Sequence, residues 1–208
     1  MSWEGPAAPY RIETERLVLR CYEPRDAPLL KEAIDSSLEH LRAFMQWAYN
    51  EPQTVEQKVE LVKLFRSDFD TGQSFTYAIF AADESELLGG AGLEPRVGPG
   101  GLEIGYWVRA SATRRGIATE LAAALTRVGF EVCGADRIEI RIEPRNQASF
   151  GVPRKLGFVE EPTLRRRLPA PEGEPLRDLT IWTMFHEDLD PALAPAIRAY
   201  DARGERVL

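Results

Sequence analysis

The sequence has 208 residues, of which 44% are hydrophobic, and its formal net charge is −7. This length and apolar fraction suit one domain with a buried core and exclude a globally disordered chain. The acidic balance argues against nucleic acid or an anionic membrane as the main partner, and it favours a cationic substrate such as an amine.

Cysteine and histidine are too rare here to build a covalent or metal framework. The two cysteines, Cys21 and Cys133, and the two histidines, His40 and His186, stand far apart in the chain. Neither pair forms a disulfide or metal-ligand pattern. No apolar run approaches the ~20 residues of a membrane span, and the first residues do not form a signal peptide, so we expect a cytoplasmic protein without a metal.

The first half of the chain predicts mostly helices. Apolar residues at 16–20 predict a short strand, and residues 26–34 predict a helix that begins with aspartate and proline. Residues 36–49 predict a second, less regular helical segment. Thr54 and Gln57 form a capping box, which predicts the start of a third helix.

The second half alternates strands and helices. Residues 75–81, 87–93 and 102–108 predict three strands of an antiparallel meander, because turn-forming residues separate them. A long helix is expected between Gly116 and Gly134, with apolar residues at spacings of three and four.

The remaining elements complete one domain. Residues 137–142 predict a strand and residues 146–156 a short helix, and two further strands are expected from Phe158 onward and at 178–185. We therefore expect a single domain over residues 12–188. Its flanks would be a flexible lead-in over residues 1–11 and a tail over residues 189–208 that either forms a short helix around Leu193 to Tyr200 or frays.

One junction carries most of the functional information. The apolar strand 103–109 runs through a basic turn into the alanine-rich helix. Helix N-termini bind phosphate because their first N–H groups lack partners and the helix dipole adds positive charge. Arg114 and Arg115 supply further charge, Gly116 lets the backbone approach closely, and Ala118 keeps the second turn open. The alternative is an ordinary junction with two solvated arginines.

The junction does not match the common nucleotide-binding motifs. Neither G-x-G-x-x-G nor G-x-x-x-x-G-K-[ST] is present in the sequence. A dinucleotide site and a P-loop are therefore disfavoured. The phosphate-bearing ligand must belong to another class.

Together with later motifs, this junction resembles the GNAT acetyltransferases. The motifs are Glu103-Ile104-Gly105-Tyr106-Trp107, Asn146-Gln147-Ala148-Ser149 and Lys155-Leu156-Gly157-Phe158, supported by Leu17-Val18-Leu19-Arg20 and Gly72-Gln73-Ser74-Phe75. They are most similar to the RimJ/RimL type, which acetylates N-terminal α-amines of ribosomal proteins. The resemblance covers residues 12–188. It implies an α/β (α+β) fold with a mixed, mostly antiparallel seven-stranded sheet flanked by helices, and acetyl-CoA as co-substrate.

The resemblance also implies which residues bind acetyl-CoA. In this family the pantetheine arm pairs with backbone where the fourth and fifth strands splay apart. The corresponding residues here are Trp107, Val108 and Arg109 along the arm, Arg114, Arg115, Gly116, Ile117, Ala118 and Thr119 at the pyrophosphate, and Asn146 at the arm. One position departs from the family, because Thr113 stands where Gln or Arg often begins the turn.

Candidate catalytic residues follow from the same resemblance. Glu103 and Glu161 correspond to carboxylates that act as a base through water, and each is alternatively an exposed acidic residue at a strand end. Ser149 matches the serine proposed in this type to protonate the departing thiolate. Its alternative role is to satisfy backbone N–H groups in the first helical turn. Tyr106 is a second candidate acid.

The acceptor is expected to be an N-terminal α-amine of a protein or peptide. The alternatives are a small-molecule N-acetyltransferase acting on an antibiotic or polyamine, and a non-catalytic acyl-CoA-binding module. Phe44, Trp47 and Tyr49 are expected either to line the acceptor pocket or to pack in the core, with core packing favoured for at least two. The run 165–167 of three arginines predicts a solvated strand edge. Apolar surface on the early helices is compatible with a homodimer.

Overall fold

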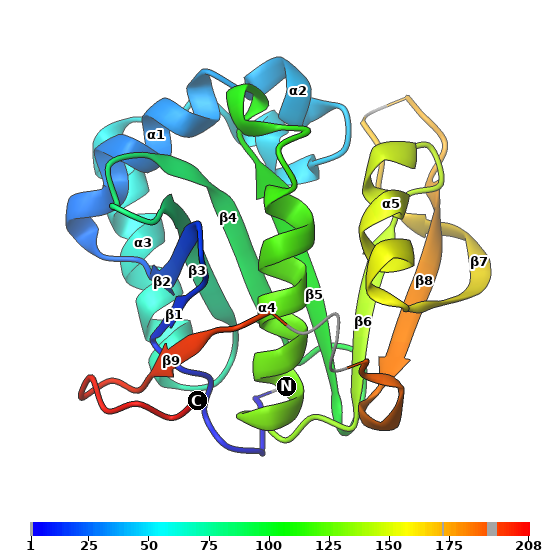
Figure 1. The fold of residues 1–208 in the computed structure, drawn as a ribbon. Helices are drawn as coiled ribbons and strands as arrows, with labels where there is room; N and C mark the ends of the chain where they lie inside the picture. Colours follow the sequence, from blue (N-terminus) through cyan, green and yellow to red (C-terminus); the bar gives the residue numbers. More distant parts are fainter. Residues whose placement is uncertain (1, 172, 191–194) are drawn as a thin grey trace.

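The sheet at the centre of the structure has nine strands within the described residues, in the order β7-β8-β6-β5-β4-β3-β2-β1-β9 (Figure 1). The computed structural model describes residues 2–171, 173–190 and 195–208. The strands are β1 (Arg11–Glu13), β2 (Leu17–Cys21), β3 (Phe75–Ala81), β4 (Leu87–Glu94), β5 (Gly101–Val108), β6 (Arg137–Ile142), β7 (Val159–Leu168), β8 (Arg177–Phe185) and β9 (Arg198–Tyr200).

Helices cover both faces of this sheet. They are α1 (Ala27–Asp35), α2 (Leu38–Arg42), α3 (Val55–Asp70), α4 (Ile117–Glu131) and α5 (Gln147–Leu156), with short 3₁₀ turns at η1 (Pro24–Asp26), η2 (Gln46–Asn50), η3 (Ala110–Ala112) and η4 (His186–Asp188). Figure 1 shows α4 and α5 in front of the sheet and α1 and α3 behind it. Within the described ranges, no helix combines the length and apolar character needed to cross a bilayer.

The core is divided by the sheet into two apolar clusters. Leu17 and Leu19 on β2 pack with α4, whereas Val18 between them packs with α1 and α3. This alternation follows from the period of two in a strand, which sends successive side chains to opposite faces. Both faces of the central strands are therefore buried.

Local signals in the sequence are confirmed where they depend on neighbouring residues. The Thr54 side chain accepts a hydrogen bond from the Gln57 N–H, and the Gln57 side chain accepts one from the Thr54 N–H, so the capping box is present at α3. The antiparallel meander β3-β4-β5 is also present. All seven strands expected from the sequence are found.

The expected strand number is corrected from seven to nine. The two additional strands, β1 and β9, pair with each other antiparallel, with Arg11 opposite Tyr200 and Ile12 opposite Ala199. Each has three residues, too few for a period-two pattern to be recognised. The short helix expected in the tail is corrected too: residues 198–200 form a strand, while positions 191–194 lie outside the described residues.

The parallel pair β5 and β6 is joined over a short distance. Its register pairs Gly101, Leu102 and Glu103 of β5 with residues 137–139 of β6. β5 continues to Val108 without a partner on that side, so the two strands diverge after Glu103. Figure 1 shows the gap between them widening toward the end where α4 begins. The divergence leaves one backbone edge of β5 available to a ligand.

Candidate active site

A cavity of about 570 Å³ lies where β5 and β6 diverge. We call it the α4 cleft. Its walls are the end of β5, the turn before α4, the first turn of α4 and one face of α5. The residues that line it include Tyr106, Trp107, Val108, Thr113, Arg114, Gly116, Ile117, Ala118, Thr119, Asn146, Ser149, Val152 and Lys155.

The backbone N–H groups in the turn before α4 are not used in hydrogen bonds among the described residues. Arg114 has φ 60° and Gly116 has φ 80°, so two left-handed residues lie within three positions. Across the described residues, no acceptor is found for the backbone N–H groups from Arg114 to Thr119. Free N–H groups at a helix N-terminus form a ready anion site, since they add hydrogen bonds to the positive end of the helix dipole.

A polar clamp from the start of β2 holds this turn in place. The Arg16 guanidinium donates to the Glu120 carboxylate at 2.7 Å and to the Arg115 carbonyl at 2.9 Å. The Thr14 hydroxyl donates to the same carboxylate at 2.5 Å. Glu120 lies in the first turn of α4, so the clamp joins β2, the turn and the helix.

Eight of the ten residues expected to bind acetyl-CoA line the α4 cleft, and two do not. Arg109 is buried behind the end of β5, where its guanidinium pairs with Glu32 at 2.7 Å and Glu86 at 3.1 Å. The Arg115 side chain is exposed, and its carbonyl is held by Arg16. A residue that neighbours a lining residue in the sequence can therefore point its side chain away from the cleft.

Some lining residues of the α4 cleft were missed by the sequence analysis. Val152 and Lys155 of α5 line it together with Ser149. The spacing of three between these residues places them near one face of a helix, which is the signal that identifies them. Lys155 adds a positive charge to the cleft.

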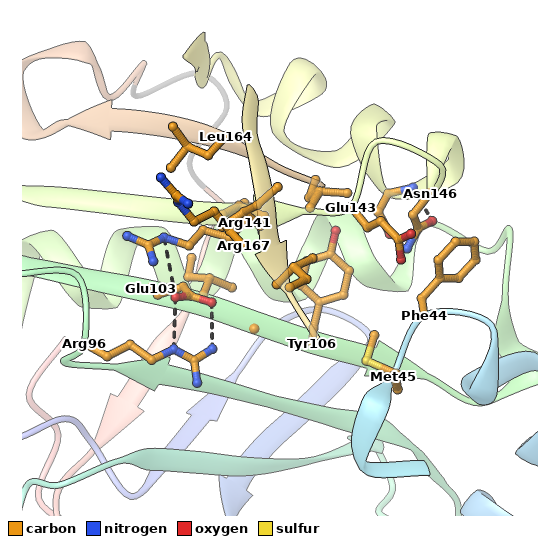
Figure 2. A pocket seen from close by; sticks show the side chains of 17 residues that line it. Phe44, Met45, Arg96, Glu103, Tyr106, Arg141, Glu143, Asn146, Leu164 and Arg167 are labelled. Atoms are coloured by element: carbon orange, nitrogen blue, oxygen red, sulfur yellow. Dashed lines mark hydrogen bonds and ion pairs between the residues drawn. The ribbon is translucent and has the colours of Figure 1, made fainter. Parts of the chain in front are cut away.

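A second cavity, of about 560 Å³, meets the α4 cleft at the divergence of the strands (Figure 2). We call it the arginine cavity, because Arg96, Arg141 and Arg167 contribute to its wall. Both cavities are lined by the same five residues, Phe44, Met45, Tyr106, Asn146 and Ser149. Two reactants bound in the two cavities would therefore meet beside these residues.

Two hydroxyl groups stand at this meeting point. Burial raises the pKa of Tyr106 to about 12, while the nearby Ser149 side chain acts in the opposite direction as a hydrogen-bond partner. No well-formed hydrogen bond to the buried Tyr106 hydroxyl is present among the described residues. Tyr106 thus keeps its proton at neutral pH and has a free hydrogen-bonding group directed toward Glu143 and Asn146 (Figure 2).

Ser149 is free to act at the same place. Asn146 caps α5, since its side-chain oxygen accepts a hydrogen bond from the Ser149 N–H at 3.3 Å. In the described structure the Ser149 hydroxyl makes no hydrogen bond to backbone, so the capping role considered for it belongs to Asn146.

The carboxylates expected to act as a base have different surroundings. Glu103 lines the arginine cavity, where its two oxygens accept hydrogen bonds from Arg96 at 2.7 and 3.0 Å. Glu161 lies exposed on β7, where the pairing with β8 is irregular, and lines neither cavity. The structure therefore brings Glu103, but not Glu161, to the cavities.

Glu143 is a carboxylate that the sequence analysis missed. It follows β6 directly, its side chain is 7% exposed, and it lines the arginine cavity beside Asn146 (Figure 2). It forms ion pairs with Arg145 at 2.5 Å and with Arg177 at 3.3 Å. Its position one residue past an alternating strand, close to the Asn-x-x-Ser motif, is the signal in the sequence.

Core packing was favoured for at least two of the three early aromatic residues, and the structure corrects this for Trp47 and Tyr49, which are exposed. Trp47 is 38% exposed and Tyr49 is 46% exposed, and Phe44 is half-buried and lines both cavities. The rings of Trp47 and Trp107 meet edge to face with centroids 5.9 Å apart. Large aromatic groups thus form an apolar rim beside the α4 cleft.

The diverging sheet thus has free backbone N–H groups in the α4 cleft and a second cavity, lined by three arginines, that meets it. Residues 16–159 match the family model of the acetyltransferase (GNAT) domain, and the chain belongs to this family. It is therefore an acetyl-CoA-dependent acyltransferase.

Known proteins support this assignment at the level of fold and family. The uncharacterized N-acetyltransferase YoaA of Bacillus subtilis is 27% identical over 74% of this chain and 86% of its own length. The putative ribosomal N-acetyltransferase YdaF of the same organism is 27% identical over 71% of this chain and 80% of its own. The structure of Mycobacterium smegmatis RimJ in complex with CoA-disulfide has a TM-score of 0.80 and 25% identity, and it covers 91% of this chain and 94% of its own.

Proposed function

We propose that this protein transfers the acetyl group of acetyl-CoA directly to the N-terminal α-amine of a protein or peptide. The observation that carries the proposal is the meeting of two cavities beside Tyr106 and Ser149. The α4 cleft would hold the coenzyme and the arginine cavity the acceptor. Likeness to RimJ, whose structure is in complex with CoA-disulfide, and to the putative ribosomal N-acetyltransferase YdaF supports the proposed reaction.

The α4 cleft suits the chemistry of coenzyme A. The free N–H groups from Arg114 to Thr119 fit a pyrophosphate, since each phosphate oxygen accepts hydrogen bonds. The unpaired edge of β5 fits the amide groups of a pantetheine arm. Gly90 on β4 leaves room for the Trp107 indole, because a Cβ there would lie 2.6 Å from the indole nitrogen.

Direct transfer makes three demands on the residues at the meeting point. The amine must be neutral to attack, the oxyanion formed at the carbonyl needs a hydrogen-bond donor, and the thiolate must gain a proton. A neutral amine at pH 7 costs about 1 kcal/mol for an α-amine and about 4–5 kcal/mol for lysine. A water-linked carboxylate such as Glu103 or Glu143 is therefore a sufficient base for an α-amine.

Ser149 is the proposed proton donor to the thiolate. The amine nitrogen bonds to the thioester carbon, and the oxyanion intermediate then collapses as the carbon–sulfur bond breaks. The amine nitrogen gives one proton to the water-linked carboxylate, the sulfur takes up the Ser149 hydroxyl proton, and water returns a proton to Ser149 as the carboxylate releases its own. Tyr106 is the second candidate, because its hydroxyl stays protonated and is free to donate. Glu161 remains a predicted base that would need to reach the cavities through a different arrangement of β7.

A small-molecule N-acetyltransferase is the second candidate function. The observation in its favour is the volume of the arginine cavity, about 560 Å³, which is typical of pockets for small ligands.

One assay separates the two candidates. Release of free CoA from acetyl-CoA is measured with Ser- and Ala-starting peptides, with polyamines and with aminoglycosides. Turnover of peptides well above the other amines supports the proposed function. Rapid turnover of small amines without turnover of peptides contradicts it and favours the small-molecule N-acetyltransferase.

A further inference from the structure

Positive charge gathers at one end of the arginine cavity. Arg96 precedes β5, Arg141 belongs to β6 and Arg167 to β7. Figure 2 shows these three side chains around Glu103, on the side of the cavity away from Glu143 and Asn146. Three separate segments of the chain thus deliver a guanidinium to one place.

The carboxylates nearby are already paired. Glu103 accepts two hydrogen bonds from Arg96 and lies 3.7 Å from Arg141. Glu139 pairs with Arg137 at 2.8 Å and with Arg141 at 2.9 Å. These acidic groups therefore leave little negative charge available to an acceptor in this part of the cavity.

The arginines of β7 are not neutralised in this way. In the part of the chain that the structure describes, the guanidinium groups of Arg165, Arg166 and Arg167 form no ion pair, although the Asp178 carboxylate accepts a hydrogen bond from the Arg166 backbone N–H at 2.9 Å. All three are exposed, and Arg167 lines the arginine cavity. The whole chain carries −7, so an excess of positive charge here is a local feature of the acceptor side.

The strand geometry gives the separation between this charge and the reacting groups. Glu103 and Tyr106 lie three residues apart on β5, and a strand rises ~3.3 Å per residue, so their Cα atoms are roughly 10 Å apart. An extended peptide covers that distance in about three residues. A peptide whose first residue lies beside Tyr106 would bring its third or fourth residue near the arginines.

We propose that the acceptor is an acidic peptide segment, with Asp or Glu within about four residues of the acetylated N-terminus, and that Arg167 recognises this carboxylate. The inference rests on the proposed function and adds the class of acceptor. It reverses the expectation from net charge, which favoured a cationic substrate. Polyamines and aminoglycosides would meet like charge, which disfavours their binding.

The test compares three peptides of equal length that begin with Ser-Ala and continue with Glu-Glu, Gln-Gln or Lys-Lys. We expect kcat/KM for the Glu peptide to exceed that of the Gln peptide about tenfold, and the Lys peptide to be the poorest. Higher salt should reduce this preference. Arg167→Gln should remove most of the preference, Arg167→Lys should keep it, and Arg167→Glu should favour the Lys peptide.

Arg203→Gln is the matched control, since Arg203 is an exposed arginine beyond β9, at the opposite edge of the sheet from β7. It should leave the preference unchanged. Thermal unfolding of each variant shows that folding is intact. Equal kcat/KM for the Glu and Gln peptides overturns the inference while leaving peptide acetylation standing.

Two further outcomes are distinguished in the same experiment. Turnover of free glutamate or aspartate without turnover of the peptides would overturn both the peptide as source of the carboxylate and the proposed peptide acceptor. Turnover of amines other than α-amines, with all three peptides inert, would mean that the proposed function itself has failed. The acceptor class and the reaction are thus tested separately.

Discussion

The α4 cleft and the arginine cavity are neighbouring regions built from different groups. The cleft presents free backbone N–H groups from a turn that contains two left-handed residues, Arg114 and Gly116. The cavity presents side chains, and its charge depends on how ion pairs such as Arg96–Glu103 are distributed. Backbone N–H groups are present whatever the residue type, so they suit a ligand that all members of a family share. Side chains differ between sequences, so they suit acceptors that differ between members.

The largest effect is expected at the boundary between the two regions. Ser149→Ala should lower kcat by about hundredfold, because the thiolate loses its proton donor. The affinity for acetyl-CoA, measured by calorimetry, should stay nearly unchanged since the backbone of the cleft is intact. Ser85→Ala, in an exposed turn after β3, is the control. Equal kcat for the Ser149 variant and the parent would remove Ser149 from the mechanism and direct attention to Tyr106.

A smaller effect is expected within the α4 cleft itself. Gly116→Val should raise the Kd for acetyl-CoA about tenfold, because a left-handed residue with a Cβ is strained by 1–3 kcal/mol and the turn would shift. The new Cβ would also lie 3.3 Å from a nitrogen of Arg16. Gly204→Val, at a left-handed glycine with open space around it, is the matched control. If both variants bind acetyl-CoA equally well, the backbone is not what holds the coenzyme.

The clamp from β2 should have a more modest influence. Arg16→Gln should raise the KM for acetyl-CoA about threefold with little change in kcat, because partly exposed ion pairs contribute less than ~1 kcal/mol. Arg16→Lys should restore only part of the loss, since lysine cannot donate to both Glu120 and the Arg115 carbonyl in one fork.

Arg198→Gln is the control for this prediction, because Arg198 pairs with Glu13 and is not joined to α4. It should leave KM at the parent value. A fall in kcat for Arg16→Gln without a change in KM would contradict a role of the clamp in positioning the turn.

The smallest expected difference between a variant and the parent concerns the pH profile. The α-amine has a pKa near ~8, so kcat/KM for a peptide should rise about tenfold per unit below that pH and then level off. Burial raises the pKa of Tyr106 to about 12, against the opposing influence of Ser149, so this hydroxyl keeps its proton up to about pH 10. A pH profile of the parent and of Tyr106→Phe checks this. A fall between about pH 8 and pH 10 in the parent alone would contradict it.

The sequence predicted well what depends on local chemistry. Gly116 and the apolar spacing after it predicted the turn and α4, because a left-handed turn and a helical face are both written in adjacent residues. Seven strands were predicted for the same reason. The strands β1 and β9 were missed because their pairing joins residues 11–13 with residues 198–200, which no local pattern reveals.

The site was harder to predict where a side chain can point either into a cavity or toward an ion-pair partner elsewhere in the fold. Arg109 follows the lining residue Val108 yet turns to Glu32 and Glu86. Glu103 lines the arginine cavity, and the turn before β5 brings Arg96 to both of its oxygens. These side-chain orientations depend on partners from other helices and strands, so the three-dimensional structure is needed to determine them.

The pairing of β9 with β1 has a consequence for the integrity of the protein in solution. β9 covers a strand edge that would otherwise offer free N–H and C=O groups to any neighbouring molecule. Loss of residues 198–208 would uncover that edge together with the apolar Ile12 beside it. A chain truncated before residue 198 would keep the lining residues of both cavities. We expect it to self-associate through the uncovered strand edge.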